Sequence, residues 1–151
     1  MIDGVVVKQL KRHADERGYL MEMLREDDDV FDHFGQTYVS MNYPEVIRAW
    51  HYHKLQTDVW VCIKGMIKVG LYDAREDSPT KGESQTVCMG DNNPVILKIP
   101  VGVYHGYKTV GVEPSYLVNF PTRAYNRAEP DEYRAKYDDP SIPYNWDIEF
   151  T

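Results

Sequence analysis

Two cysteines, Cys62 and Cys88, are all that this 151-residue chain contains, and they form no C-x-x-C pair. So few cysteines argue against a disulfide scaffold, and we expect both to be reduced thiols. The sequence also lacks an apolar run long enough for a secretory leader or a membrane span. We therefore expect a cytoplasmic protein that has no membrane partner.

An excess of basic residues is also missing. The 17 lysines and arginines are outnumbered by 24 aspartates and glutamates, for a net charge of −7. Nucleic-acid binding needs a basic face, so we predict no nucleic-acid partner. A small anion could still be held by a few local arginines. The length fits one domain, and we expect residues 1–151 to form a single unit.

Helical periodicity is weak, and the chain contains no internal repeat, low-complexity tract or linker. Short runs of β-forming residues between Gly, Pro and Asp predict strands instead. Lys64-Gly65 between two such runs predicts a hairpin. The predicted strands are 5–7, 19–24, 36–41, 47–52, 59–63, 66–72, 85–89, 95–99, 105–108 and 115–120.

Evenly spaced strands with turn signals predict an all-β sandwich or barrel, and a jelly roll fits this pattern. Residues 26–34 and 130–136 are the candidates for short helices. The C-terminal segment 137–151 is rich in Pro, Asp and aromatic residues. We expect it to form an ordered wrap over the barrel.

Three histidines and one carboxylate are spaced so that a small barrel could direct them to one point. His51 and His53 stand at i and i+2, which face the same side of a strand. Asp58 directly precedes the next predicted strand, and His105 begins a later one. Neutral imidazoles with a carboxylate suit one divalent metal such as Zn, Fe, Mn or Ni. Alternatively, the histidines are polar barrel lining and Asp58 caps a turn.

The spacing of these residues follows two motifs. H-x-H-x4-D-x6-G runs from His51 to Gly65, and P-x-G-x2-H ends at His105. This resembles the two motifs of metal-binding cupins, with Asp in place of their usual Glu. Glu45 stands where the first motif has its leading Gly. The resemblance implies a cupin fold, a double-stranded β-helix or jelly-roll barrel.

A further set of motifs occurs in a fixed order along nearly the whole chain. Residues 15–22 fit D-x-R-G-x-x-x-E, and residues 78–82 fit S-P-T-x-G. Residues 36–40 (QTYVS) resemble Q-x-N-x-S with Tyr38 in place of Asn, and residues 48–52 (RAWHY) resemble R-G-L-H-Y. Residues 99–107 (IPVGVYHGY) resemble I-P-x-G-x-A-H-G-F, and residues 139–146 (DPSIPYNW) resemble D-P-x-L-x-I-x-W. In this order they resemble the dTDP-4-dehydrorhamnose 3,5-epimerase family, a branch of the cupins.

This resemblance implies a chemistry. The family's substrate is a dTDP-linked 4-keto-6-deoxy sugar. A histidine oriented by an aspartate removes a proton next to the ketone, a lysine stabilises the enolate, and a tyrosine reprotonates the opposite face. By position, His51 would be the base and Asp139 its orienting partner.

The resemblance also implies a binding site for the nucleotide. Arginine suits a diphosphate because its planar fork donates two hydrogen bonds at once. The implied substrate-binding residues are Arg17, Glu22, Gln36 and Arg48 for the nucleotide and diphosphate, Tyr125 for stacking on the base, and Asn119 at the position of the family's acid tyrosine.

Three departures from the family stand at the expected reaction centre. Asp58 replaces the family's lysine, His53 replaces a glutamine, and Asn119 replaces the tyrosine. A negative charge in place of the lysine would oppose enolisation. A bound divalent cation would return the positive charge and could polarise a ketone. The first two departures therefore favour the same metal site.

Three functions follow from these patterns. The preferred one is a nucleotide-sugar epimerase or isomerase, assisted by a metal. The second is a metal-dependent cupin enzyme of other chemistry, such as a dioxygenase or lyase, because fold does not fix function. The third is a non-catalytic sugar-nucleotide binding module. We also expect a homodimer, since the family exchanges N-terminal strands and two-fold dimers are common.

Overall fold

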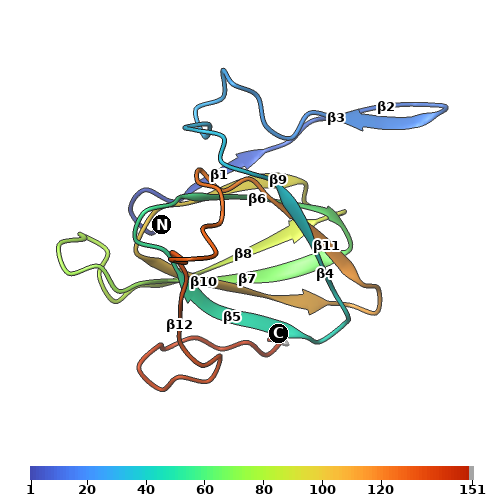
Figure 1. The fold of residues 1–151 in the computed structure, drawn as a ribbon. Helices are drawn as coiled ribbons and strands as arrows, with labels where there is room; N and C mark the ends of the chain where they lie inside the picture. The colour runs from blue at the N-terminus through green and yellow to red at the C-terminus, as the bar shows by residue number, and fades with distance from the viewer. Residues whose placement is uncertain (150–151) are drawn as a thin grey trace.

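The computed structural model describes residues 1–149 as two facing antiparallel sheets and a projecting hairpin (Figure 1). The strands are β1 (Val6–Gln9), β2 (Arg12–Asp15), β3 (Gly18–Met21), β4 (Tyr38–Asn42), β5 (Ile47–Tyr52), β6 (Asp58–Lys64), β7 (Met66–Asp73), β8 (Ser84–Gly90), β9 (Val95–Ile99), β10 (Val103–Val110), β11 (Ser115–Asn119) and β12 (Tyr133–Arg134). The first sheet has the order β1-β9-β6-β11-β4, and the second has β12-β5-β10-β7-β8. The hairpin is β2-β3. The predicted all-β barrel is confirmed.

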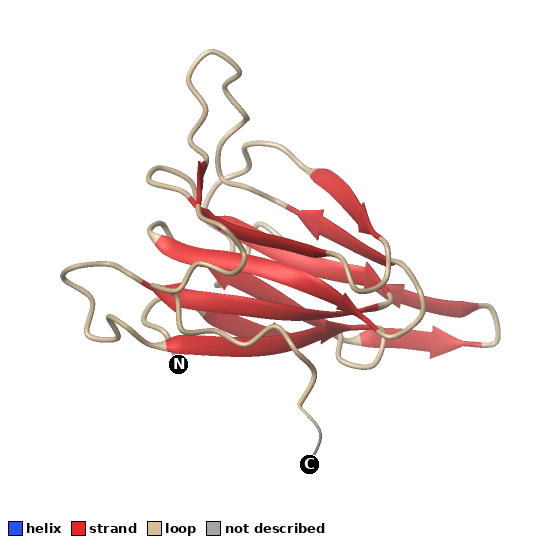
Figure 2. Cartoon of the chain, turned by 90° about the horizontal axis from the view of Figure 1, so that it is seen from below, coloured by secondary structure: helices blue, strands red, loops and turns tan. Residues whose placement is uncertain are grey.

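The structure has no helix within residues 1–149, and hence none that could cross a membrane (Figure 2). The two predicted short helices are therefore wrong. In 26–34, the Asp28 carboxylate accepts a hydrogen bond from the Arg25 backbone and pairs with Lys8, which favours turns over a helix. In 130–136, β12 extends the edge of the second sheet at β5 and pairs its backbone there.

The predicted hairpin at Lys64-Gly65 is also wrong. β6 belongs to the first sheet and β7 to the second, so the chain crosses between sheets at Gly65. Gly65 has a φ of 73°, and a Cβ there would lie 2.7 Å from the Pro114 carbonyl oxygen. Asp91 fixes this crossing, because its carboxylate accepts the Gly65 N–H at 2.7 Å. A turn signal between two strands thus predicted the break but not the pairing partners.

Apolar side chains from both sheets fill the space between them. Trp60 of β6 and Leu97 of β9 meet Val69 and Leu71 of β7 in one buried cluster. Burying an aliphatic side chain of this size contributes about 1.5–3 kcal/mol. The predicted alternation along β6 is confirmed, since Trp60 points into this cluster while Val59 packs on the other side of the sheet.

The C-terminal segment covers the outer face of the second sheet, as predicted for the part that lies within 137–149. Residues 150–151 of the predicted wrap lie outside the described residues. The ring of Trp50 lies 4.9 Å from that of Trp146 and 5.3 Å from that of Tyr144, measured between centroids. Gly70 makes room for this layer, because a Cβ there would lie 2.8 Å from both Tyr144 and Trp146.

Both cysteines are free thiols in the structure, Cys62 buried and Cys88 exposed. Glu45, which replaces the leading Gly of the first cupin motif, has a φ of 66°. This left-handed conformation favours glycine and is uncommon for other residues. The Glu45 side chain pairs with the nearly buried Lys108 at 2.8 Å. The backbone bend of the motif is therefore kept without its glycine.

Candidate active site

A cavity of about 570 Å³ opens between the two sheets. Tyr38 and Asn119 reach it from the first sheet, and His51 reaches it from the second. Asp58, at the start of β6, lines it as well. Its volume lies in the range of small-molecule sites, and its lining combines aromatic and polar side chains.

Three of the four predicted metal ligands converge at the wall of this cavity, where His53 and Asp58 line it and His105 is buried beside them. One ligand atom each from His53, Asp58 and His105 lies within 4.8 Å of the others. The Oδ2 atom of Asp58 is 3.5 Å from Nε2 of His53 and 3.6 Å from Nε2 of His105. His51 is the fourth predicted ligand. It lies beside this group, with its ring centroid 5.7 Å from that of His105.

The orientation of the two histidines follows from their second nitrogens. Nδ1 of His105 lies 2.9 Å from the Val103 carbonyl oxygen, and Nδ1 of His53 contacts the Asp131 carbonyl oxygen. A carbonyl oxygen only accepts, so each Nδ1 carries the proton and donates it. In the neutral imidazole, Nε2 then presents a lone pair towards Asp58. Nε2 of His105 is buried and has no hydrogen-bond partner within the described residues.

Asp58 is 2% exposed and has a full set of donors around it. Its Oδ1 accepts from the Gln56 amide at 2.8 Å, and its Oδ2 accepts from Asn119 at 2.9 Å and from the Trp60 indole at 3.3 Å. Burial raises the pKa of this carboxyl. When the flanking imidazoles of His105 and His53 also carry a proton on Nε2, their hydrogen bonds and charge outweigh burial and hold the pKa of Asp58 well below its usual range. Asp58 is therefore a fixed negative charge in the cavity wall.

Burial is the main influence on the pKa of His51. Together with the charges of His105, Arg134 and His53, it lowers this pKa to about 3, and the charge of Asp58 opposes the shift only in part. His51 is therefore a neutral imidazole near pH 7, with a lone pair that can accept a proton. His53 differs, because burial lowers its pKa but the contact with Asp58 outweighs burial and raises it.

Asn119 joins Asp58 to Tyr38 across the first sheet. Its side-chain amide donates to Oδ2 of Asp58 at 2.9 Å and to the Tyr38 hydroxyl at 2.9 Å. Asn119 and Tyr38 are direct partners in the register of β11 and β4. Burial of the phenol, with the charge of Asp58, raises the pKa of Tyr38, so the hydroxyl keeps its proton near neutral pH.

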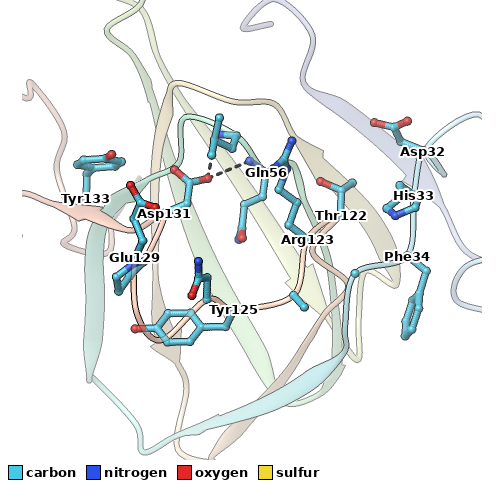
Figure 3. Close-up of a pocket in the computed structure, with 15 residues that line it drawn as sticks. Asp32, His33, Phe34, Gln56, Thr122, Arg123, Tyr125, Glu129, Asp131 and Tyr133 are labelled. Atoms are coloured by element: carbon cyan, nitrogen blue, oxygen red, sulfur yellow. Dashed lines mark hydrogen bonds between the residues drawn. The ribbon is translucent and has the colours of Figure 1, made fainter.

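A second cavity of about 880 Å³ adjoins the first and shares three lining residues with it, Gln56, Tyr125 and Asp131. Figure 3 shows Tyr125, Asp131 and Gln56 among the residues that line it. Tyr125 is 51% exposed, and the Gln36 side chain accepts its backbone N–H at 3.1 Å. The predicted base-stacking tyrosine and Gln36 therefore stand together at the entrance.

Of the other predicted site residues, Arg48 lies at the inner cavity and Asp139 does not. Arg48 lines the inner cavity and donates to Asn42. Asp139, the predicted partner of His51, accepts hydrogen bonds from Ser141 and lines neither cavity. The structure thus brings Arg48 but not Asp139 to the wall that carries His51.

Arg17 lies in the turn of the β2-β3 hairpin, and Glu22 directly follows β3. Arg17 is 84% exposed in its side chain and pairs with Asp15, while Glu22 pairs with Arg25 at 2.9 Å. Neither residue lines the two cavities of its own chain. Their hairpin projects from the barrel, as Figure 1 shows.

Asp131 is a site residue that the sequence did not reveal. Its carboxylate accepts the backbone N–H groups of residues 54–56, and its carbonyl accepts from His53. It thereby fixes the loop that follows His53. The sequence suggested a helix at 130–136, and only the Pro130-Asp131 pair hinted at a turn there.

A jelly-roll barrel with two histidines and a carboxylate gathered between its sheets is typical of the cupin class. The family model described as dTDP-4-dehydrorhamnose 3,5-epimerase matches residues 1–151. The chain belongs to this family, and the resemblance found in its motifs is confirmed.

Two curated relatives are similar over nearly the whole chain. The spore coat polysaccharide biosynthesis protein SpsL of Bacillus subtilis is 49% identical over 150 residues, 99% of each chain. The probable low-salt glycan biosynthesis epimerase Agl13 of Haloferax volcanii is 48% identical over 98% of this chain and 96% of its own. Among solved structures, a dTDP sugar isomerase from Desulfovibrio desulfuricans has a TM-score of 0.90 at 34% identity, covering 96% of this chain and 92% of its own.

Proposed function

We propose that this protein is a nucleotide-sugar epimerase or isomerase that acts on a dTDP-linked 4-keto-6-deoxy sugar. One observation carries the proposal: a neutral, buried His51 stands in a cavity that adjoins a second one with Tyr125 at its rim. The inner cavity suits the sugar, and the outer one suits the nucleotide. Family membership and the relatives described above support the same reaction class.

The chemistry of His51 follows from its neutrality. Its lone pair would take the proton from the carbon next to the ketone, and the C–H electron pair would form an enolate. Arg48 on the same wall supplies a fixed positive charge for the diphosphate. Release of the sugar nucleotide after reprotonation completes an isomerisation that needs no redox partner.

Proton exchange tests this function directly. We expect wild-type protein to exchange the hydrogens next to the ketone of dTDP-4-keto-6-deoxyglucose with D2O, followed by NMR. His51→Asn should lower this exchange about 10²–10⁴-fold, the usual contribution of a general base. Asp138→Asn, at an exposed acid that lines neither cavity, is the control. Exchange by wild type would exclude the non-catalytic module. Absence of both exchange and calorimetric binding of dTDP- or UDP-sugars would refute the proposal.

We also propose that one divalent cation, Zn, Fe, Mn or Ni, is held by His53, Asp58 and His105. Three acceptor atoms converge there, and both Nδ1 protons are already donated to carbonyls. Such a cluster is repulsive unless a positive charge joins it. Two imidazoles and a carboxylate fit a borderline metal, and the set leaves positions open to the cavity. Such an ion, when bound, would polarise the ketone and take the part of the family's lysine.

Metal analysis of protein purified without added metal tests this site. We expect about one equivalent in wild type and almost none in His53→Ala and Asp58→Ala, with His13→Ala as the control. If wild-type protein contains no metal and does not bind added Zn²⁺, the result would instead support an ion pair between protonated imidazoles and Asp58. Stoichiometric iron with oxygen consumption would favour the dioxygenase alternative.

We further propose a cytoplasmic homodimer whose β2-β3 hairpin packs on a second copy of the chain. The hairpin carries exposed Tyr19 and Leu20, 51% and 63% accessible, beside the exposed Arg17. Apolar side chains on a projecting ribbon favour burial against a partner. Size-exclusion chromatography with light scattering should give a dimer, and Leu20→Asp should shift it towards monomer. A monomeric wild type would contradict this assembly.

A further inference from the structure

Tyr38 and Asn119 both depart from the family's motifs, and in the sequence these two departures look unrelated. Asn119 stands where the family's tyrosine is expected, and Tyr38 stands where its motif has Asn. In the structure these two positions are direct cross-strand partners on β4 and β11. The two residue types have therefore changed places across one rung of the first sheet.

The geometry keeps a phenol hydroxyl in the reaction cavity. Both residues line the 570 Å³ cavity that contains His51. The Asn119 amide donates to the Tyr38 oxygen at 2.9 Å, so this oxygen acts as the acceptor of that bond. The hydroxyl hydrogen of Tyr38 is then left free to donate to another group. Although 46% of Tyr38 is exposed, its hydroxyl end is fixed by Asn119 within the cavity lining.

Inversion at carbon needs two groups on opposite sides of the substrate. A single base can remove and return a proton on one face only. His51 belongs to β5 in the second sheet, and Tyr38 belongs to β4 in the first. Both side chains line the same cavity. Because they come from different sheets, we expect the imidazole and the phenol to approach a bound sugar from opposite sides.

We propose that Tyr38 is the catalytic acid that delivers a proton to the face of the sugar opposite His51. The proposal rests on the epimerase function proposed above. Asn119 is its positioning residue, because the amide fixes the phenol oxygen while its second hydrogen bond is anchored on Asp58.

The proton balance of the step is closed. His51 takes the proton from the carbon next to the ketone, and that C–H electron pair forms the enolate. The Tyr38 O–H then breaks and its proton bonds to the same carbon from the other side, which restores the ketone. The imidazolium of His51 releases its proton to water, and the phenolate regains one from water, so substrate and product are isomers.

Tyr38→Phe tests the role because it removes only the hydroxyl. With dTDP-4-keto-6-deoxyglucose in D2O, we expect this variant to keep wash-in of deuterium on the starting face within about threefold of wild type. Formation of the inverted product should fall about 10²–10⁴-fold, as for loss of a general acid. Tyr43→Phe, an exposed tyrosine beyond the end of β4, is the matched control and should change neither rate.

The double variant Tyr38→Asn with Asn119→Tyr returns the phenol to β11. We expect its inversion rate to be at least about tenfold higher than that of the Tyr38→Asn single variant. A merely structural role of Tyr38 would give no such recovery, and thermal unfolding checks that all variants are folded. Failure of the double variant in a folded protein, with Tyr38→Phe equal to wild type in inversion, would overturn the assignment.

The outcomes separate this assignment from the underlying function. If wild type catalyses exchange and inversion while Tyr38→Phe loses both rates equally, Tyr38 serves binding and the acid role is wrong. If wild type catalyses neither, the epimerase function itself fails, and the role of Tyr38 fails with it.

Discussion

Asp131 fixes the His53 loop through one carboxylate and one carbonyl group. Its carboxylate accepts three backbone N–H groups at 2.9–3.0 Å, and its carbonyl accepts from Nδ1 of His53. Partners of this kind orient a metal-binding imidazole and set which nitrogen faces the metal. The side chain thus controls the geometry of the cluster from outside it.

We expect Asp131→Ala to weaken Zn²⁺ binding about 10–100-fold, because His53 loses its fixed loop. A competition titration with a chelator measures this affinity. Asp138→Ala, an exposed acid nearby in the sequence, is the control and should bind as wild type does. Equal affinity in all three proteins would contradict a positioning role for Asp131.

Residue spacing predicted much of the site. The pattern from His51 to His105 placed four candidate ligands at one point, and the structure gathers three of them within 4.8 Å. Spacing could not separate His51 from His53, because β5 ends at Tyr52 and His53 already belongs to the loop. It also could not reveal Asp131, whose contacts span 75 to 78 residues of sequence.

At the scale of elements, the wrap over the second sheet depends on a glycine in β7. Tyr144 and Trp146 lie where a side chain at Gly70 would have to stand. Their rings also pack on Trp50 of β5, so one aromatic cluster joins the C-terminal segment to two strands. This packing, rather than helix formation, orders the wrap within residues 137–149.

Gly70→Val should destabilise the protein by about 1–3 kcal/mol or more, because its side chain would push into Tyr144 and Trp146. Urea unfolding followed by tryptophan fluorescence gives the free energy of unfolding. Ser84→Val, exposed on neighbouring β8, is the control and should stay within about 0.5 kcal/mol of wild type. A Gly70→Val protein as stable as wild type would show that the wrap does not press on β7.

Elements were predicted better than their connections. Alternating and β-branched residues predicted most strands, but β2 and β12 were missed because each is short and lies at an edge. The break between two strands at Gly65 was predicted correctly, but the predicted pairing of these strands in a hairpin was wrong. A turn signal does not say whether the next strand pairs with the last one or crosses to the facing sheet, since packing decides that.

For the whole molecule, a buried carboxylate sets the response to acid. Asp73 is fully buried and accepts hydrogen bonds from Arg75, Ser78 and Thr80. The Arg75 guanidinium, with the two hydroxyls, holds the pKa of Asp73 below its usual range. Because the folded pKa lies below the unfolded one, its stabilisation is present above about pH 4 and is lost as pH falls below this.

Asp73→Asn should therefore cost about 2 kcal/mol at pH 7, since hydrogen bonds to a charged group are replaced by weaker ones. The difference from wild type should shrink as the pH falls from 5 to 2. Urea unfolding across this range measures it in a domain expected to unfold as one unit. The exposed Asp138→Asn serves as the control. A difference that does not change with pH would refute the linkage.

The sequence by itself determined the strand pattern, the cupin barrel, the family and the cluster of histidines with Asp58. These follow from local periodicity, turn residues and motif order, which a chain carries in its residues. Only the tertiary structure decided which residues meet. It separated His51 from the three converging ligands and placed Asp131 behind His53. It also joined Tyr38 to Asn119, because sheet register brings together residues far apart in the chain.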